Sequence, residues 1–291
     1  MQGHHDREIQ QAIITELAVA AHSDAEEDLR RRIEFLADYL ISSGLTTLIL
    51  GISGGIDSTT TGRMAQLAVE RVRAQGNDAE FLAMRLPYGV QRDEADAQTA
   101  LQFIRPDRTI TIDIKPATDA MLAALVMGEL TFLHAAHQDF VVGNIKARQR
   151  MIAHYGVANV HAGLVLGTDH AAEAVMGFFT KFGDGACDLA PLSGLTKRRV
   201  RAIATVLGVP ISLIHKVPTA DLESLSPQRP DEDAYGISYD EIDDFLEGKV
   251  VSAPVYDTIL KFYNGSKHKR ALPLRPHSAG QTAQKDLVDK T

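Results

Sequence analysis

The chain has 291 residues, a formal net charge of −8 and a single cysteine, Cys187. A chain of this length can bury a sizeable core, and 45% hydrophobic residues is ordinary for a globular protein. No stretch approaches the ~20 apolar residues that a membrane span needs, and a lone cysteine forms no internal disulfide. We therefore expect no membrane segment and a reducing cytoplasm, and the negative charge argues against a nucleic-acid partner.

Helical and strand patterns alternate along the chain. Residues 1–45 contain two helical segments, and the second, residues 24–42, follows Ser23 with Glu26 at capping-box spacing. Apolar, β-branched runs predict four strands, each followed by helical sequence. These strands are expected at residues 46–52, 80–86, 108–114 and 163–168. Repeated strand–helix units predict an α/β fold, a doubly wound, Rossmann-like parallel sheet with helices on both faces.

No linker or internal repeat divides the sequence, so we expect a single domain over residues 1–275. Within it, residues 222–236 are rich in Ser, Pro, Asp and Gln. This segment is too long for an ordinary connection, which is typical of a mobile lid loop. Residues 276–291 are expected to form a polar C-terminal tail.

The most informative segment is residues 48–59, which pass from an apolar strand through a glycine turn into a helix. Gly54 and Gly55 allow positive φ and close approach of an anion, while the first N–H groups of the helix have no intrahelical acceptor. Asp57 stands where most phosphate loops carry a lysine. Because a bare carboxylate would repel phosphate, Asp57 predicts a Mg²⁺ ion that bridges the two.

Two other interpretations of this loop remain open. Gly51 to Gly55 also match the G-x-S-x-G nucleophile elbow, which would make Ser53 the nucleophile of a serine hydrolase. Such an enzyme needs a later acid and histidine and an earlier glycine-rich oxyanion loop, and residues 1–45 contain no such loop. The turn could also serve only to pack a helix on a strand. The Walker A and G-x-G-x-x-G patterns do not match.

Two charged positions on later segments suggest partners for the loop. Glu173 lies in the first turn of the helix after strand 163–168, as Asp57 does after strand 46–52. Since strand ends converge in a parallel sheet, the two carboxylates could share Mg²⁺, although Glu173 could merely complement the helix dipole. Lys197 opens a basic run at a helix start, where cations are unfavourable. An anion nearby would explain that run, and a solvated helix face is the alternative.

The loop at residues 53–58 resembles the pyrophosphatase loop of the ATP pyrophosphatases. Segments at residues 166–173, 178–185 and 195–198 resemble one branch of that group, the ammonia-dependent NAD synthetases. Further matching segments are residues 85–89, 144–148, 218–222 and 268–270. The resemblance therefore covers most of residues 8–273.

The resemblance implies an ATP-dependent ligase that amidates nicotinic acid adenine dinucleotide (deamido-NAD) to NAD with free ammonia. Its implied ATP contacts are Gly51, Ile52, Ser53, Gly54, Gly55, Ile56, Asp57, Ser58, Arg85, Gln91, Thr168, Lys197 and Thr219. Its implied deamido-NAD contacts are Arg148, Lys181, Asp188, His268 and Lys269. It further implies Mg²⁺ on Asp57 and Glu173, and a homodimer with the dinucleotide at the subunit interface. Another ligase of the ATP pyrophosphatase group is the alternative.

The implied reaction has two steps. The substrate carboxylate attacks the α phosphate of ATP to give an NAD-adenylate and pyrophosphate, and ammonia then displaces AMP. Asp57, Glu173 and Lys197 are expected to offset charge in the first step. Asp184 is our candidate to position or deprotonate ammonium, although an aspartate beside glycines is also a common turn residue. Free ammonium is the expected donor, because Cys187 has no constellation typical of a glutamine-hydrolysing partner domain.

Overall fold

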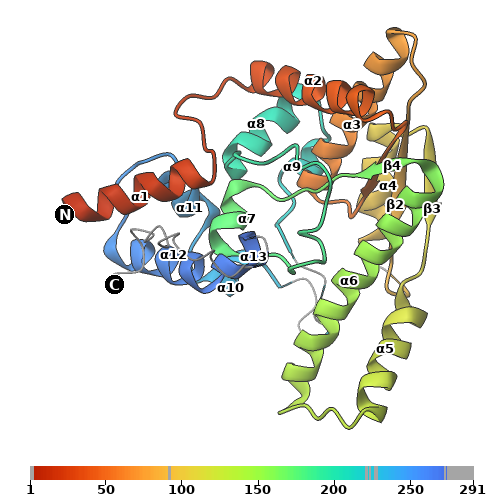
Figure 1. The fold of residues 1–291 in the computed structure, drawn as a ribbon. Coiled ribbons are helices and arrows are strands. Elements are labelled where there is room, and N and C mark those ends of the chain that lie inside the picture. Colours follow the sequence, from red (N-terminus) through yellow and green to blue (C-terminus); the bar gives the residue numbers. More distant parts are fainter. Residues whose placement is uncertain are drawn as a thin grey trace, which may run out of the picture.

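The computed structural model describes residues 3–90, 93–219, 222, 224–225, 229–271 and 273. Its centre is a parallel sheet of four strands within these residues, in the order β3-β2-β1-β4 (Figure 1). The strands are β1 (Thr47–Gly51), β2 (Glu80–Arg85), β3 (Arg108–Thr111) and β4 (Gly163–Val165). The chain builds outward from β1 to β3 and then returns to place β4 on the other side of β1. This reversal is a switch point, where parallel sheets commonly bind ligands.

Helices cover both faces of the sheet, as predicted. One face carries α2 (Ala25–Ser43), α3 (Ile56–Ala74) and α8 (Lys197–Leu207), and the other carries α6 (Ala135–His161). Side chains of β1 alternate between the two layers, because successive residues of a strand point to opposite faces. Leu48 and Leu50 join the core under α3, whereas Ile49 joins the core under α6. The predicted buried strand is therefore confirmed.

A second cluster of helices lies beside the sheet and has its own apolar core. It is built mainly from α1 (His4–Glu16), α7 (Ala171–Met176), α10 (Asp231–Tyr235), α11 (Tyr239–Leu246) and α12 (Ala253–Gly265). Helices α7 and α8 contact α11. These contacts place the residues after β4 and the start of α8 at the junction of the two parts.

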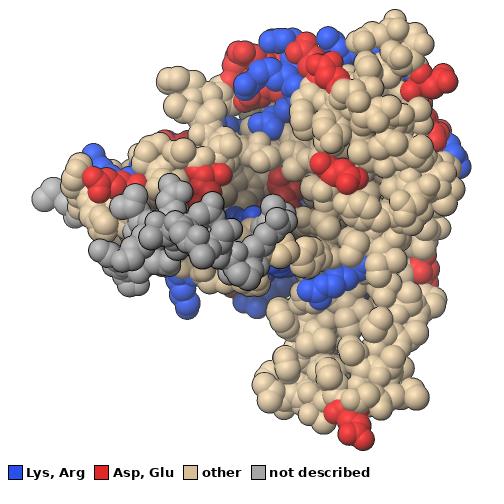
Figure 2. Space-filling view, in the orientation of Figure 1, with Lys and Arg blue, Asp and Glu red and all other residues tan. Residues whose placement is uncertain are grey.

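The remaining helices are α4 (Glu94–Ile104), α5 (Lys115–Met127), α9 (Ile211–Ile214) and α13 (Lys267–Arg270). Helix α5 packs on α6, and the two project away from the sheet as a hairpin. The face of this projection that is seen in Figure 2 carries few charged side chains. Among the described residues, no helix is long and apolar enough to span a bilayer.

The four strands lie where the sequence predicts them, but several of their ends differ. Strand β3 ends at Thr111 rather than residue 114, and β4 ends at Val165 rather than residue 168. Strand β3 is the edge of the sheet and is mostly exposed. Beyond β4, Leu166 pairs with Leu189 in an isolated bridge. The apolar pattern thus continues past each strand, because burial extends beyond the sheet hydrogen bonds.

The capping box expected at Ser23 and Glu26 is wrong. The N-cap of α2 is Asp24, whose side chain accepts a hydrogen bond from the Glu27 N–H at 2.9 Å. Ser23 Oγ instead donates to the buried carboxylate of Asp28 at 2.6 Å. The helix begins one residue later than predicted. The side chain that accepts the Glu27 N–H is therefore that of Asp24 and not that of Ser23.

The segment at residues 222–236 is only partly a loop. Its last residues form α10, and Thr219 pairs with Pro230 across its base. At the other end, the Lys146 ammonium donates to the Leu222 carbonyl at 2.8 Å. Residues 223 and 226–228 lie outside the described residues, as does the tail at residues 276–291. The lid and the single-domain boundary stay predictions.

The revised cap can be tested by stability. We expect Asp24→Ala to lower the free energy of unfolding by about 1 kcal/mol, because the Glu27 N–H loses its acceptor. Glu26→Ala is the matched control: Glu26 is exposed, and its loss should cost less than about 0.5 kcal/mol. Urea unfolding of both variants measures the difference. A larger effect of Glu26→Ala would restore the capping box.

Candidate active site

A cavity of about 320 Å³ opens at the carboxyl ends of the strands. Its walls come from residues 50–58, 84–86 and 166–168, and from residues 216–219 before α10. These are the strand ends that the sequence predicted would converge. The cavity therefore lies at the switch point, between the sheet and the second helical cluster.

The glycine turn after β1 forms one wall of this cavity. Gly54 has φ +85°, and a Cβ there would lie 2.6 Å from the Ala97 nitrogen, so only glycine fits. Gly55 is the N-cap of α3 and has no side chain to cap the helix. The start of α3 faces the cavity, and N–H groups that have no intrahelical acceptor could bind an anion there. The contact of Gly54 with Ala97 shows that the turn also packs closely on α4.

The hydrolase interpretation fails on the contacts of Ser53. Its hydroxyl lies 3.1 Å from the Ser58 hydroxyl and accepts the Gly55 N–H at 3.3 Å. No histidine of the described residues hydrogen-bonds it. A serine nucleophile needs a base within reach, so these contacts instead indicate a hydroxyl that shapes the loop.

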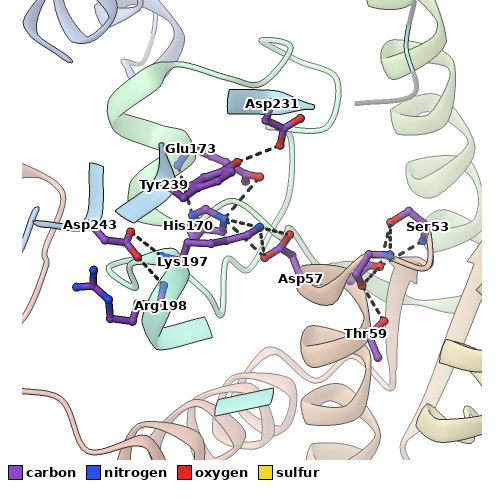
Figure 3. A network of polar contacts seen from close by, with 12 residues as sticks. Ser53, Asp57, Thr59, His170, Glu173, Lys197, Arg198, Asp231, Tyr239 and Asp243 are labelled. Atoms are coloured by element: carbon purple, nitrogen blue, oxygen red, sulfur yellow. Dashed lines mark hydrogen bonds and ion pairs between the residues drawn. The ribbon is translucent and has the colours of Figure 1, made fainter. Parts of the chain in front are cut away.

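The Lys197 side chain reaches the loop from α8, 140 residues later in the sequence. Its ammonium donates to both carboxylate oxygens of Asp57, at 3.0 and 2.8 Å (Figure 3). The Lys197 side chain is fully buried, so the solvated-face alternative is wrong for this residue. Burial lowers the pKa of Lys197, but the charges of Asp57 and Glu173 outweigh burial and leave that pKa raised. For Asp57, burial raises the pKa. The charge of Lys197 outweighs burial and leaves the pKa of Asp57 lowered, so Asp57 stays ionised.

Glu173 lies opposite Asp57, in the first turn of α7. Burial first, and then the charge of Asp57, raise the pKa of Glu173 well above its usual range. One ligand atom each of Asp57, Glu173 and His170 lies within 4.8 Å of the others. Lys197 supplies only one positive charge to these two carboxylates, and hard oxygen donors suit Mg²⁺. The residues therefore fit the predicted ion.

The basic run at the start of α8 is explained by an acid that the sequence did not reveal. Asp243, on α11, accepts the backbone N–H groups of Lys197 at 2.9 Å and Arg198 at 2.6 Å. This carboxylate caps α8 from another helix. The expectation of an anion near the basic run is confirmed. The sequence could not show that this anion is Asp243, because the contact depends on the packing of α11 against α8.

The other predicted ATP residues lie in different settings. Thr168 and Thr219 line the cavity directly. Arg85 also lines it, but its guanidinium donates to the Ile52 carbonyl and pairs with Glu94, so it braces the start of the loop. The Ile56 side chain is buried in the core. Gln91 lies outside the described residues.

Four of the five residues predicted to contact the dinucleotide gather at one edge. Arg148 donates to the Lys181 carbonyl at 3.3 Å, and the Lys181 ammonium donates to the His268 carbonyl. Lys269 donates to the carbonyls of residues 177 and 179. Asp188 stands apart from these contacts and braces β4, where its carboxylate accepts the Val165 N–H at 2.7 Å.

Asp184 lies between two cavities. It lines the main cavity and a second, mostly apolar one of about 210 Å³, and its side chain remains solvent-accessible. Its carboxylate accepts the Thr180 N–H at 2.9 Å, so the expected turn role is real. Surrounding protein nevertheless desolvates the group and raises its pKa. The role of Asp184 in the turn is therefore compatible with its predicted role of positioning or deprotonating ammonium.

Several residues of the site were missed in the sequence. Arg150, Lys216 and Asp231 line the cavity, and His170 is buried beside it. Lys216 pairs with Asp93 at 3.2 Å and with Asp96 at 2.7 Å, where it holds the 216–219 segment to α4. None belongs to a short motif with a known mechanism, although the position of His170 just before a helix was a usable signal.

Comparison with known proteins decides the family. Residues 28–273 match the NAD synthase family. The chain belongs to this family. It is 66% identical to the NH(3)-dependent NAD(+) synthetase of Burkholderia ambifaria over 91% of this chain and 94% of that protein.

Solved structures of the NAD synthase family agree with the fold. NAD+ synthetase from Burkholderia pseudomallei is 61% identical with a TM-score of 0.80, over 92% of this chain and 98% of that one. NMN synthetase from Francisella tularensis is 34% identical with a TM-score of 0.77, over 88% and 100%. The predicted resemblance and fold class are confirmed.

The repulsion at Glu173 predicts a measurable stability difference. Since its folded-state pKa is raised, Glu173 makes the metal-free protein less stable as pH rises from the ordinary carboxyl range through that pKa. We expect Glu173→Gln to raise the Tm of the protein in EDTA at pH 7. Mg²⁺ at 100 times its Kd should stabilise the wild type by about 2.7 kcal/mol, but the variant much less. A variant less stable than the wild type in EDTA would contradict the assignment.

Proposed function

We propose that the protein is an ammonia-dependent NAD synthetase, a ligase that forms a C–N bond. It uses ATP and free ammonia to amidate deamido-NAD, through an NAD-adenylate, with release of AMP and pyrophosphate. Support comes from relatives of that name at about two-thirds identity over nearly the whole chain. The observation that carries the proposal is the cluster of the buried Lys197 with the partly buried Asp57 and Glu173 beside the N-terminus of α3.

The first step needs charge neutralisation more than it needs covalent chemistry. A carboxylate oxygen of deamido-NAD forms a bond to the α phosphorus while the bond to the β-phosphate oxygen breaks. The N–H groups at the start of α3 receive the departing pyrophosphate, and Lys197 adds a fixed positive charge. Asp57 and Glu173 would hold Mg²⁺, which would supply further positive charge to the phosphates. Thr168 and Thr219 line the same space and orient the nucleotide.

The second step needs a nucleophilic amine. Ammonium must lose a proton before its nitrogen can attack the adenylate carbonyl, after which the C–O bond to AMP breaks. Asp184 is solvent-accessible, faces the cavity and has a raised pKa, so it accepts a proton more readily than an ordinary aspartate. We assign it the positioning and deprotonation of ammonium.

The dinucleotide is assigned to the edge where Arg148, Lys181, His268 and Lys269 meet, because a pyrophosphate linker requires cations. We propose that Asp188 acts there through β4.

The α5–α6 projection adds a further inference about assembly, since Met127, Leu133 and Phe140 are 85%, 84% and 58% exposed. Exposed apolar side chains on this projection, whose face in Figure 2 carries few charges, suit a homodimer interface. A monomer at micromolar concentration in analytical ultracentrifugation would contradict this.

We also propose a cytoplasmic enzyme. ATP is abundant there, and a reducing environment preserves the free thiol of Cys187. Detection of the protein in the soluble cytoplasmic fraction of its host, rather than in an oxidising compartment, is the expected result.

The function is tested by product analysis. The enzyme is incubated with ATP, Mg²⁺, ammonium and deamido-NAD, and we expect equal amounts of NAD, AMP and pyrophosphate. Parallel reactions replace deamido-NAD with nicotinic acid mononucleotide, because a 34% identical relative is named NMN synthetase. Others replace ammonium with glutamine. Products of ADP and phosphate would refute the proposal, and preference for the mononucleotide would change the substrate.

The role of Asp57 is tested by substitution. We expect Asp57→Asn to lower kcat/KM for ATP by about 100-fold or more, because the loop loses the charge that holds both Lys197 and the cation. Ser53→Ala should be milder, since its hydroxyl contacts only loop groups among the described residues. Asp78→Asn, at an exposed turn, is the control. A loss in Ser53→Ala that exceeds the loss in Asp57→Asn would revive a serine nucleophile.

A further inference from the structure

One residue at the centre of the site has no part in the chemistry above. His170 is the N-cap of α7 and is 1% exposed, between the two carboxylates assigned to Mg²⁺ (Figure 3). Its ring also packs edge-on against Tyr239, with 6.2 Å between ring centroids. A buried imidazole held on all sides has a defined orientation, so each ring nitrogen can be given a role.

The Nδ1 atom is committed to the helix. It accepts the backbone N–H of Glu173 at 3.3 Å, which is the capping hydrogen bond of α7. A nitrogen that accepts a hydrogen bond carries no proton. In a neutral imidazole the proton must then reside on Nε2.

The Nε2 atom faces the two acids. It lies 3.6 Å from an Asp57 oxygen and 3.6 Å from a Glu173 oxygen. The Lys197 nitrogen lies 3.3 Å from Nε2; two of its three protons go to the oxygens of Asp57, and with a proton on Nε2 the third must point away from the ring. A proton on Nε2 would therefore be directed between the carboxylates. A protonated nitrogen has no lone pair for a metal, so His170 is not a third ligand.

We propose that His170 is a positioning residue: the cap of α7 fixes its tautomer, and its Nε2–H holds the carboxylates of Asp57 and Glu173 in place for the cation. The inference rests on the proposed cation site. It assigns one side chain two linked tasks, one for the helix that presents Glu173 and one for the ligands themselves. Outer groups that orient metal ligands typically change metal affinity by about 10- to 100-fold.

The tautomer gives a test without turnover. Protein labelled with ¹⁵N-histidine is studied by long-range ¹H–¹⁵N correlation in EDTA, and the His170 signals are identified by their loss in His170→Asn. We expect the proton on Nε2. A proton on Nδ1 would overturn the proposal, because Nε2 would then accept from Lys197 or be free to bind metal.

Two substitutions separate the two tasks. His170→Asn places an oxygen near the position of Nδ1, so it should keep the Tm of the wild type but weaken Mn²⁺ binding at least 10-fold. His170→Gln places an amide nitrogen near the position of Nε2, so it should lower the Tm yet bind Mn²⁺ within about threefold of the wild type. Mn²⁺ alone is titrated and followed by electron paramagnetic resonance.

The outcomes distinguish this proposal from the function it rests on. Equal Mn²⁺ affinity in His170→Asn and the wild type would overturn the positioning role. Failure of His170→Gln to bind better than His170→Asn would overturn it as well. Absence of saturable Mn²⁺ binding in the wild type would refute the cation site itself, and a proton found on Nδ1 would refute only the role of His170.

Discussion

The buried ion pair between Lys197 and Asp57 is the interaction on which the rest of the site depends. Removing two charges from water is costly, and the cost is offset only by close geometry and further hydrogen bonds. Here the ammonium reaches both oxygens of the carboxylate. The pair joins the loop after β1 to the start of α8, and it fixes a positive charge beside an open helix N-terminus. Removal of either partner would leave an uncompensated charge inside the protein.

Around this pair, the site is short of one further positive charge. Asp57 is neutralised by Lys197, but no second cation pairs with Glu173 among the described residues. Burial and then the charge of Asp57 raise the pKa of Glu173. The same imbalance is expected to destabilise the metal-free protein and to favour binding of a small divalent cation. The folded protein is thus expected to lose stability at the place where it binds a ligand, which is common at functional sites. His170 fits this interpretation, because an uncharged donor can hold two carboxylates without neutralising them.

The arrangement depends on two structural parts that meet at one edge. The sheet supplies the loop after β1, while the second helical cluster supplies α7 with Glu173 and α11 with Asp243. Helix α8 belongs to the first core, yet its first residues are capped by an acid of the second. Asp243 offsets the penalty of placing cations at a helix start. The joint between the two parts therefore doubles as the support of the active site, and a shift of one part would move Lys197 relative to Asp57.

Much of this protein could be predicted from local sequence. The strand–turn–helix at residues 48–59, the parallel strands and the helical position of Glu173 follow from apolar periodicity and glycine geometry, which act over a few residues. Even there, the cap of α2 at Asp24 and the ends of β3 and β4 were missed, since neighbouring polar groups compete over single residues. Tertiary structure alone decided that Lys197 is buried on Asp57, that Asp243 caps α8, that Asp188 braces β4 and that His170 lies between two acids. Those contacts join residues that are distant in the chain or depend on how a ring is packed, and no local pattern records which side chains folding will bring together.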